Sequence, residues 1–174
     1  AVTKSINTIP IQISIALGKA TGITHEARAA KAGRAKIIET AHRMGITTPL
    51  TDSVSLPIGS AEVTVIDQAA AYAVFANGGR RAKPYAAVEV RNSAGEVIYR
   101  HDDEKPEQVL STQVVADMNF MLNKVVEEGT ARRAQIEGVK VAGKTGTTNA
   151  YRDAWFVGYT GNYVGAVWVG NDDH

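Results

Sequence analysis

In several stretches of the chain, apolar residues recur three and four positions apart, which is the spacing of one face of an α-helix. Thr8, Thr24 and Thr64 are each placed to cap the start of such a stretch. The pattern predicts four helices, over residues 8–17, 24–44, 64–77 and 112–128. A glycine directly follows each of them and is placed to end it: Gly18, Gly45, Gly78 and Gly129.

Five other segments have the residue types of β-strands and are bounded by turn residues. Residues 84–91 and 96–101 predict a hairpin. Three further runs, 139–146, 153–159 and 163–170, are separated by short polar loops and predict an antiparallel meander. Because the last two runs carry apolar residues at both odd and even positions, we expect helices to cover both faces of this sheet. The predicted fold class is therefore α+β, with an antiparallel sheet flanked by helices.

Composition and charge narrow the classes of function. The 174 residues include 19 Lys and Arg and 18 Asp and Glu, which gives a net charge of +1, and 44% of them are hydrophobic. This balance argues against disorder and against a dedicated nucleic-acid binder. No apolar run approaches the roughly 18 residues that cross a bilayer. The chain has no cysteine, and its four histidines lack the spacing of metal ligands, so we expect no disulfide, metal or cofactor.

The segment around Lys144 carries the densest signal for chemistry, and it admits two interpretations. Gly138, Gly143, Lys144 and Thr145 match the Walker A pattern of phosphate-binding loops. That mechanism needs a glycine-rich loop followed by a helix. Here the residues between the two glycines favour a strand, and the residues after Thr145 would begin a poor helix. Nucleotide binding therefore stays as the less favoured alternative.

The second interpretation is a site for acyl transfer on an extended strand. Gly146 has no side chain to block a peptide that pairs with this backbone. The Lys144 ammonium provides positive potential for a carboxylate and can tune a neighbouring proton carrier. The hydroxyls of Thr145 and Thr147 can bind that carboxylate, and the Thr147 N–H can donate to a developing oxyanion.

A second short motif, Ser5-Ile6-Asn7, lies near the start of the chain. A serine hydroxyl can relay a proton between amines, and an asparagine amide can both accept from and donate to a peptide bond. Taken alone, the motif is equally typical of the loop that enters a helix.

In this order, Ser5-x-Asn7 and Lys144-Thr145-Gly146 resemble part of the active-site set of penicillin-binding proteins and serine β-lactamases, which joins Ser-x-x-Lys, Ser-x-Asn and Lys-Thr-Gly. The resemblance extends over nearly the whole chain. The further segments that resemble the transpeptidase domain of class A, bifunctional penicillin-binding proteins are 56–64, 71–79, 125–133, 153–159 and 168–172.

The resemblance implies D,D-transpeptidation in peptidoglycan synthesis. In that family a serine attacks the D-Ala-D-Ala end of a stem peptide, releases the last D-Ala and passes the acyl group to an amine on a neighbouring strand. β-Lactams acylate the same serine. The resemblance makes Ser5, Asn7 and Lys144 the expected catalytic residues. The expected substrate-binding residues are Thr145, Gly146 and Thr147.

The resemblance also implies partners and a location. The expected partners are peptidoglycan stem peptides and β-lactams, with no nucleic acid. The full-length protein is expected at the extracytoplasmic, periplasmic face of the bacterial inner membrane, which it reaches only through an anchor outside this chain, and the chain itself is expected to be soluble. Carboxypeptidase and β-lactamase activities stay open as alternatives, because the same motifs serve these two activities and transpeptidation.

One motif of the resembled set is missing. No lysine of the chain has Ser or Thr three positions before it, so the nucleophile and its base are absent. Ser5 is a conceivable substitute, but no base lies beside it in the sequence. The chain also opens at Ala1 without Met and stops at His174 after a strand-like run.

We therefore expect residues 1–174 to be the C-terminal portion of a transpeptidase domain, without the N-terminal portion that bears the nucleophile. Alone, the chain is expected to be inactive, with part of its sheet missing, and stable only beside that portion. A non-catalytic module that binds peptidoglycan or β-lactams is the alternative.

Overall fold

The computed structural model describes residues 1–102, 105–148 and 152–171. Its helices are α1 (Thr8–Lys19), α2 (Glu26–Met44), α3 (Val65–Ala76) and α4 (Thr112–Glu128). Short 3₁₀ helices are η1 (Val2–Lys4), η2 (Leu56–Ile58) and η3 (Arg132–Ala134). The strands are β1 (Arg80–Arg81), β2 (Glu89–Arg91), β3 (Val97–Arg100), β4 (Glu107–Gln108), β5 (Ala142–Thr147), β6 (Asp153–Tyr159) and β7 (Val164–Gly170). The predicted α+β class is confirmed.

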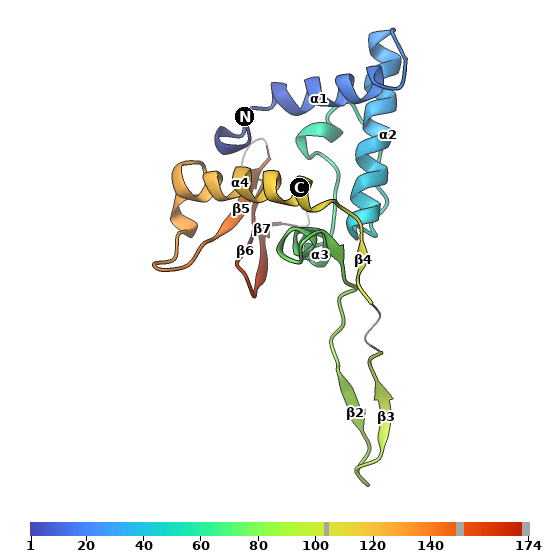
Figure 1. The fold of residues 1–174 in the computed structure, drawn as a ribbon, viewed down its shortest axis with the longest axis vertical. Coiled ribbons are helices and arrows are strands. Elements are labelled where there is room, and N and C mark those ends of the chain that lie inside the picture. Colours follow the sequence, from blue (N-terminus) through green and yellow to red (C-terminus); the bar gives the residue numbers. More distant parts are fainter. Residues whose placement is uncertain (103–104, 149–151, 172–174) are drawn as a thin grey trace.

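The elements form a body and a projecting arm (Figure 1). Helices α3 and α4 lie beside the three-stranded sheet β5-β6-β7, while α1 and α2 cross each other farther from it. The hairpin of β2 and β3 extends away from the body, beyond the short pair β1–β4 at its base. None of the helices in the described ranges is long and apolar enough to cross a membrane.

The start of α3 and the end of α2 follow the predicted capping chemistry, and α4 has a side-chain cap that was not predicted. The Thr64 hydroxyl accepts a hydrogen bond from the Asp67 N–H at 3.2 Å at the start of α3. The Ser111 hydroxyl accepts one from the Val114 N–H at 3.3 Å at the start of α4. Gly45 ends α2 in the left-handed region, with φ of 116°. Each side-chain cap satisfies a backbone donor that the helix itself leaves free.

The predicted starts of α1 and α2 are each wrong by one residue. Helix α1 begins after Asn7 rather than after a Thr8 cap, and α2 begins after His25 rather than Thr24. Neither Asn7 nor His25 makes a side-chain capping bond. The starts of α1 and α2 are therefore not fixed by side-chain caps.

Gly18 does not end α1 as predicted, because the helix continues through it to Lys19. A Cβ at Gly18 would lie 1.8 Å from the Ala29 carbonyl oxygen of α2. On the other side of the contact, a Cβ at Gly33 would lie 1.7 Å from the Ser14 carbonyl oxygen of α1. The two glycines therefore let the backbones of α1 and α2 approach much more closely than side chains would permit.

At the start of α3, Thr64 and Asp67 form only half of a capping box. Instead of turning back to the Thr64 backbone, the buried Asp67 carboxylate accepts four hydrogen bonds from Thr47 and Thr48. Two come from backbone N–H groups, at 3.0 and 2.8 Å, and two from hydroxyls, at 2.9 and 2.6 Å. Asp67 therefore ties the start of α3 to the loop that follows α2.

The predicted meander is confirmed, with β5 and β7 both antiparallel to the central strand β6. Strand β5 begins later than predicted, at Ala142, and continues one residue further, to Thr147. In this register Lys144 lies opposite Val157, and Gly146 lies opposite Trp155. Within the described residues β5 pairs only with β6, so its other edge is open.

The expected cover on both faces of the sheet is wrong for β7. The face with Ala142 and Tyr159 packs against Phe75 of α3 and Leu122 of α4. On β7 the alternate residues point the other way, and Val167 and Val169 are 58% and 66% exposed. Apolar residues at both odd and even positions therefore show that both faces of β7 are apolar. Within the described residues, helices cover only one of these two faces.

Candidate functional site

The structure brings Ser5 and Lys144 together, although 139 positions of sequence separate them. Ser5 follows η1, and Lys144 lies in β5. The Lys144 Nζ donates a hydrogen bond to the Ser5 Oγ at 2.9 Å and a second to the Thr145 carbonyl at 2.8 Å. An ammonium and a hydroxyl in direct contact form a path along which a proton can pass.

The Ser5 backbone has an uncommon conformation, with φ of 53° and ψ of 47°. Among the described residues it is the only one other than glycine with positive φ. For a serine this left-handed conformation costs about 1–3 kcal/mol, so surrounding contacts have to hold it. It turns the chain sharply between η1 and α1, and the hydroxyl meets Lys144 at that turn.

Lys144 is partly buried, and burial lowers the pKa of its ammonium below the ordinary value. The cause is desolvation, which disfavours the charged form of a lysine. A lowered pKa makes the proton of Lys144 easier to transfer to a neighbouring group, so Lys144 and Ser5 are suited to proton transfer.

Asn7 lies two residues beyond Ser5, at the N-cap of α1, where its side chain is exposed and caps nothing. In the described part of the chain it makes no hydrogen bond to β5. The structure therefore leaves its amide free at the surface next to Ser5, and its predicted contact with a substrate amide stays a prediction.

The open edge of β5 presents backbone groups of two predicted site residues. The Thr148 N–H donates to the Asp153 carbonyl at 3.1 Å, which makes Thr148 and Asp153 a hydrogen-bonded pair of the antiparallel ladder. Bonded and non-bonded pairs alternate along such a ladder. The N–H and C=O groups of Gly146 therefore face β6, whereas those of Thr145 and Thr147 face the open edge, available to an added strand.

Gly146 borders on an aromatic ring. A Cβ at this position would lie 3.2 Å from the Cβ of Trp155, which is tighter than ordinary contact. This gives Gly146 a packing role besides the predicted one of leaving room for an extended peptide.

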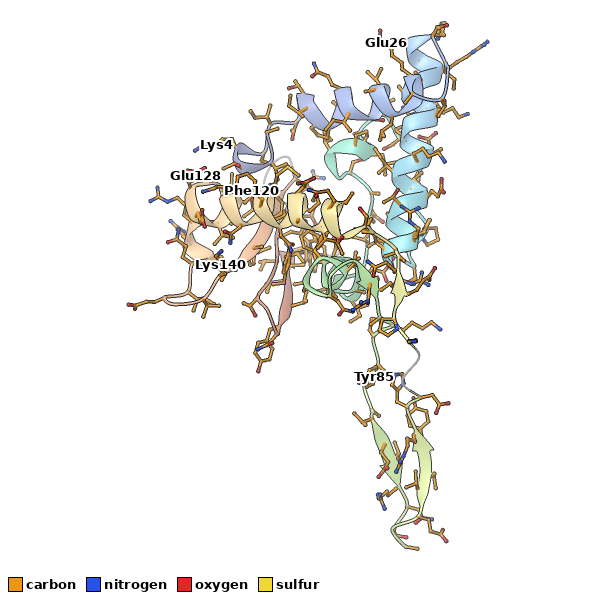
Figure 2. All side chains as sticks on the ribbon, in the orientation of Figure 1. Lys4, Glu26, Tyr85, Phe120, Glu128 and Lys140 are labelled. Carbon is orange, nitrogen blue, oxygen red and sulfur yellow. The ribbon has the colours of Figure 1, made fainter. Side chains whose placement is uncertain are left out.

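Thr130, which the sequence reasoning missed, joins the two parts of the site. Its hydroxyl and that of Thr145 form a hydrogen bond at 2.7 Å, and its N–H donates to the Thr3 carbonyl at 3.2 Å. Nearby, the Lys4 Nζ donates to the Glu128 carbonyl at 3.4 Å, and both residues lie at the same end of α4 (Figure 2). The only signal in the sequence was that Thr130 falls within a segment resembling penicillin-binding proteins.

The geometry does not support the Walker A alternative. Lys144 and Thr145 lie inside β5, paired with Val157 and Phe156 of an antiparallel neighbour. A phosphate-binding loop instead wraps its backbone N–H groups around the ligand and opens a helix. Among the described residues there is also no group of three or more His, Cys, Asp or Glu side chains placed to hold a metal ion.

With this geometry in hand, comparison with known proteins identifies the family. The profile of the penicillin-binding protein transpeptidase domain matches residues 1–173. The chain belongs to the penicillin-binding protein transpeptidase family. Penicillin-binding protein 1A of Aquifex aeolicus is 43% identical over 145 residues, which cover 82% of this chain and 19% of that protein. Penicillin-binding protein 1B of Haemophilus influenzae is 34% identical over 152 residues, covering 83% of this chain and 19% of that protein.

Solved structures of penicillin-binding proteins share the fold. Penicillin-binding protein 1A from Haemophilus influenzae superposes with a TM-score of 0.77 at 24% identity, covering 99% of this chain and 29% of that one. Penicillin-binding protein A from M. tuberculosis, an imipenem acyl-enzyme complex, gives 0.74 at 22% identity, covering 100% of this chain and 42% of that one. The resemblance inferred from the motifs is confirmed. The chain spans about a fifth of the length of the curated penicillin-binding proteins named above.

Proposed function

We propose that this chain is the substrate-holding portion of a serine-type D,D-transpeptidase of peptidoglycan synthesis, and that β-lactams bind at the same site. The observation that carries the proposal is the 2.9 Å contact between the Lys144 Nζ and the Ser5 Oγ beside the open edge of β5. Membership of the penicillin-binding transpeptidase family supports it. The imipenem acyl-enzyme of M. tuberculosis penicillin-binding protein A, a structural neighbour, supports the β-lactam part.

The open edge of β5 suits an extended stem peptide. Such a peptide adds a strand to the sheet and pairs with the outward backbone groups of Thr145 and Thr147. Its terminal carboxylate accepts hydrogen bonds from the hydroxyls of these two threonines, within the positive potential of Lys144. The Thr147 N–H donates to the oxyanion that develops at the scissile carbonyl. The Asn7 amide contacts a peptide bond of the substrate.

The reaction then needs a serine from outside the chain. That serine passes its proton to the lysine of its own motif and attacks the carbonyl carbon of the penultimate D-Ala, and an ester forms as the peptide bond breaks. The terminal D-Ala leaves as an amine, protonated through Ser5, with Lys144 beside it to supply and recover the proton. An amine of a neighbouring strand attacks the ester and gives a proton back to Lys144 through Ser5. A new peptide bond forms as the ester bond breaks, and the released serine regains its proton from the lysine of its own motif.

We further propose that the missing serine and its lysine lie in an N-terminal portion of the same domain. The sequence of the chain contains no Ser-x-x-Lys motif. Within the described residues the outer edge of β7 has no strand beside it, and Val167 and Val169 are exposed. The N-terminal portion would pair with the edge of β7 and cover these valines, so that neither an unpaired strand edge nor an apolar face stays exposed to water. The full-length protein acts at the periplasmic face of the inner membrane, held there by an anchor outside this chain.

Labelling with a fluorescent penicillin tests the proposal. We expect the full-length protein to form a covalent adduct, residues 1–174 alone to form none, and peptide mapping to place the adduct outside residues 1–174. An adduct on Ser5 would show that Ser5 is itself the nucleophile. No labelling of the full-length protein would refute transpeptidation. Reversible binding of penicillin by the full-length protein, without an adduct, would instead support the non-catalytic binding module.

A further inference from the structure

Thr130 lies between the two segments that carry the predicted site residues. It follows the end of α4, and its backbone N–H donates to the Thr3 carbonyl, two residues before Ser5. A Cβ at the preceding Gly129 would lie 2.4 Å from the same Thr3 oxygen, so the backbones are in close contact here. The loop that carries Ser5 is therefore anchored to the end of α4 at Thr130.

The side chain of Thr130 reaches the other segment. Its hydroxyl lies 2.7 Å from the Thr145 hydroxyl of β5. Each threonine hydroxyl has one proton to donate and can also accept. If the Thr145 hydroxyl is to donate its proton to a substrate carboxylate, it is free to do so only when it accepts, rather than donates, in its bond with Thr130. The direction of this bond therefore decides where the Thr145 proton points.

We propose that Thr130 is a positioning residue of the transpeptidase site. It donates its hydroxyl proton to Thr145, which turns the Thr145 O–H toward the terminal carboxylate of the bound peptide or β-lactam. This inference rests on the proposed function, in which Thr145 binds that carboxylate. Thr130 touches no reacting atom, and its effect is specific to ligands that carry a carboxylate.

Three variants of the full-length protein separate this role from a general structural one. Thr130→Val keeps the shape of the side chain and removes the hydroxyl, whereas Thr130→Ser keeps the hydroxyl. Thr21→Val is the matched control, because the Thr21 hydroxyl also makes a hydrogen bond, to the Gly18 carbonyl at 2.7 Å, at the far end of α1. The second-order rate of acylation is measured with a penicillin and with its carboxyl methyl ester, alongside thermal melting.

We expect Thr130→Val to slow acylation by the penicillin about tenfold, the usual effect of one misplaced hydrogen bond to a charged group. Acylation by the methyl ester should stay within about twofold of the wild type, because the ester presents no carboxylate to orient. Thr130→Ser and Thr21→Val should leave both rates close to wild type. In a Thr145→Val background, adding Thr130→Val should cause no further loss, because Thr130 acts through Thr145.

Three results would each overturn the positioning role. The first two are that Thr130→Val slows acylation by both probes equally, or by neither. The third is that adding Thr130→Val to Thr145→Val slows acylation by the penicillin as much as it does in the wild type. If Thr130→Val melts too early to assay, Thr130→Ala replaces it with the same expected ratio between the two probes. The wild-type protein tests the proposed function separately. If the wild type is acylated by penicillin but Thr130→Val does not slow the penicillin more than the methyl ester, the proposed function stands and only the role of Thr130 falls. If the wild type is not acylated at all, both fall.

Discussion

Replacement of Lys144 by methionine tests the contact on which the site is built. Methionine has a similar length and no charge, so the change removes the hydrogen bonds from Nζ to Ser5 Oγ at 2.9 Å and to the Thr145 carbonyl at 2.8 Å. A hydrogen bond from a charged donor contributes about 1.5–3 kcal/mol, which corresponds to about a 10- to 150-fold effect on a rate. The Lys144–Ser5 bond is accessible to water, which weakens it. We therefore expect acylation to slow by about 10- to 30-fold, toward the lower end of that range.

The assay is the rate of covalent labelling of the full-length protein by a fluorescent penicillin. Lys140→Met is the matched control, because Lys140 is exposed and precedes β5 by two residues (Figure 2). It removes the same charge from the same region without touching Ser5. Thermal melting of both variants shows whether the fold is intact. A folded Lys144→Met protein that is labelled as fast as Lys140→Met would refute the assignment of Lys144 to the site.

Three further outcomes follow from the structure. Gly18→Ala places a Cβ 1.8 Å from a carbonyl oxygen of α2, so we expect a loss of about 1–3 kcal/mol in unfolding free energy by thermal melting. Gly161→Ala, which has open space, should melt like the wild type, and equal melting of the two variants would contradict the packing argument. Burial raises the pKa of Asp67, but its bonds from Thr48 and Thr47 outweigh this and hold the pKa below its ordinary value. Its stabilising effect is therefore present above the unfolded pKa, near 4, and is lost as the pH falls through the folded pKa. In the Asp67→Asn variant, the melting temperature should fall less steeply as the pH is lowered through this range. An unchanged dependence of the melting temperature on pH would refute the reasoning. Residues 1–174 alone should self-associate in size-exclusion chromatography and melt without a sharp transition, because Val167 and Val169 are exposed. A monomer with a sharp two-state melt would count against a missing portion of the domain.

Much of the fold could be predicted from the sequence because the relevant signals are local. Helix α4 was predicted from residue 112 to residue 128, since its apolar stripe and the Gly129 that ends it lie next to one another in the sequence. The meander was predicted because its strand-like runs and the short polar loops between them also follow one another directly in the sequence. Gly18 was misjudged because a glycine can end a helix or admit a close neighbour, and only the position of Ala29 in α2 decides between the two.

The site could be predicted only as far as chemistry and spacing reach. Lys144 and Thr145 were picked out as a carboxylate-binding pair on a strand, whereas the contact of Lys144 with Ser5 depends on how distant elements pack. Thr130 could not be found in this way, because a bond between two hydroxyls on an exposed turn and a strand leaves no periodic pattern. The exposure of Val167 was missed because the parity of apolar residues shows that a face is apolar, and not what covers it.

The long separation between Ser5 and Lys144 along the chain affects how easily the contact between them is lost. Contacts between distant positions carry a larger loop-closure entropy than local ones. The first residues of the chain are held near the end of α4 by the bond from the Thr130 N–H to Thr3 and by the bond from Lys4 to Glu128. Local opening of this short segment, away from the end of α4, would separate Ser5 from Lys144 while the sheet and its helices stay intact. Reactivity toward penicillin would then disappear before any global unfolding is detected.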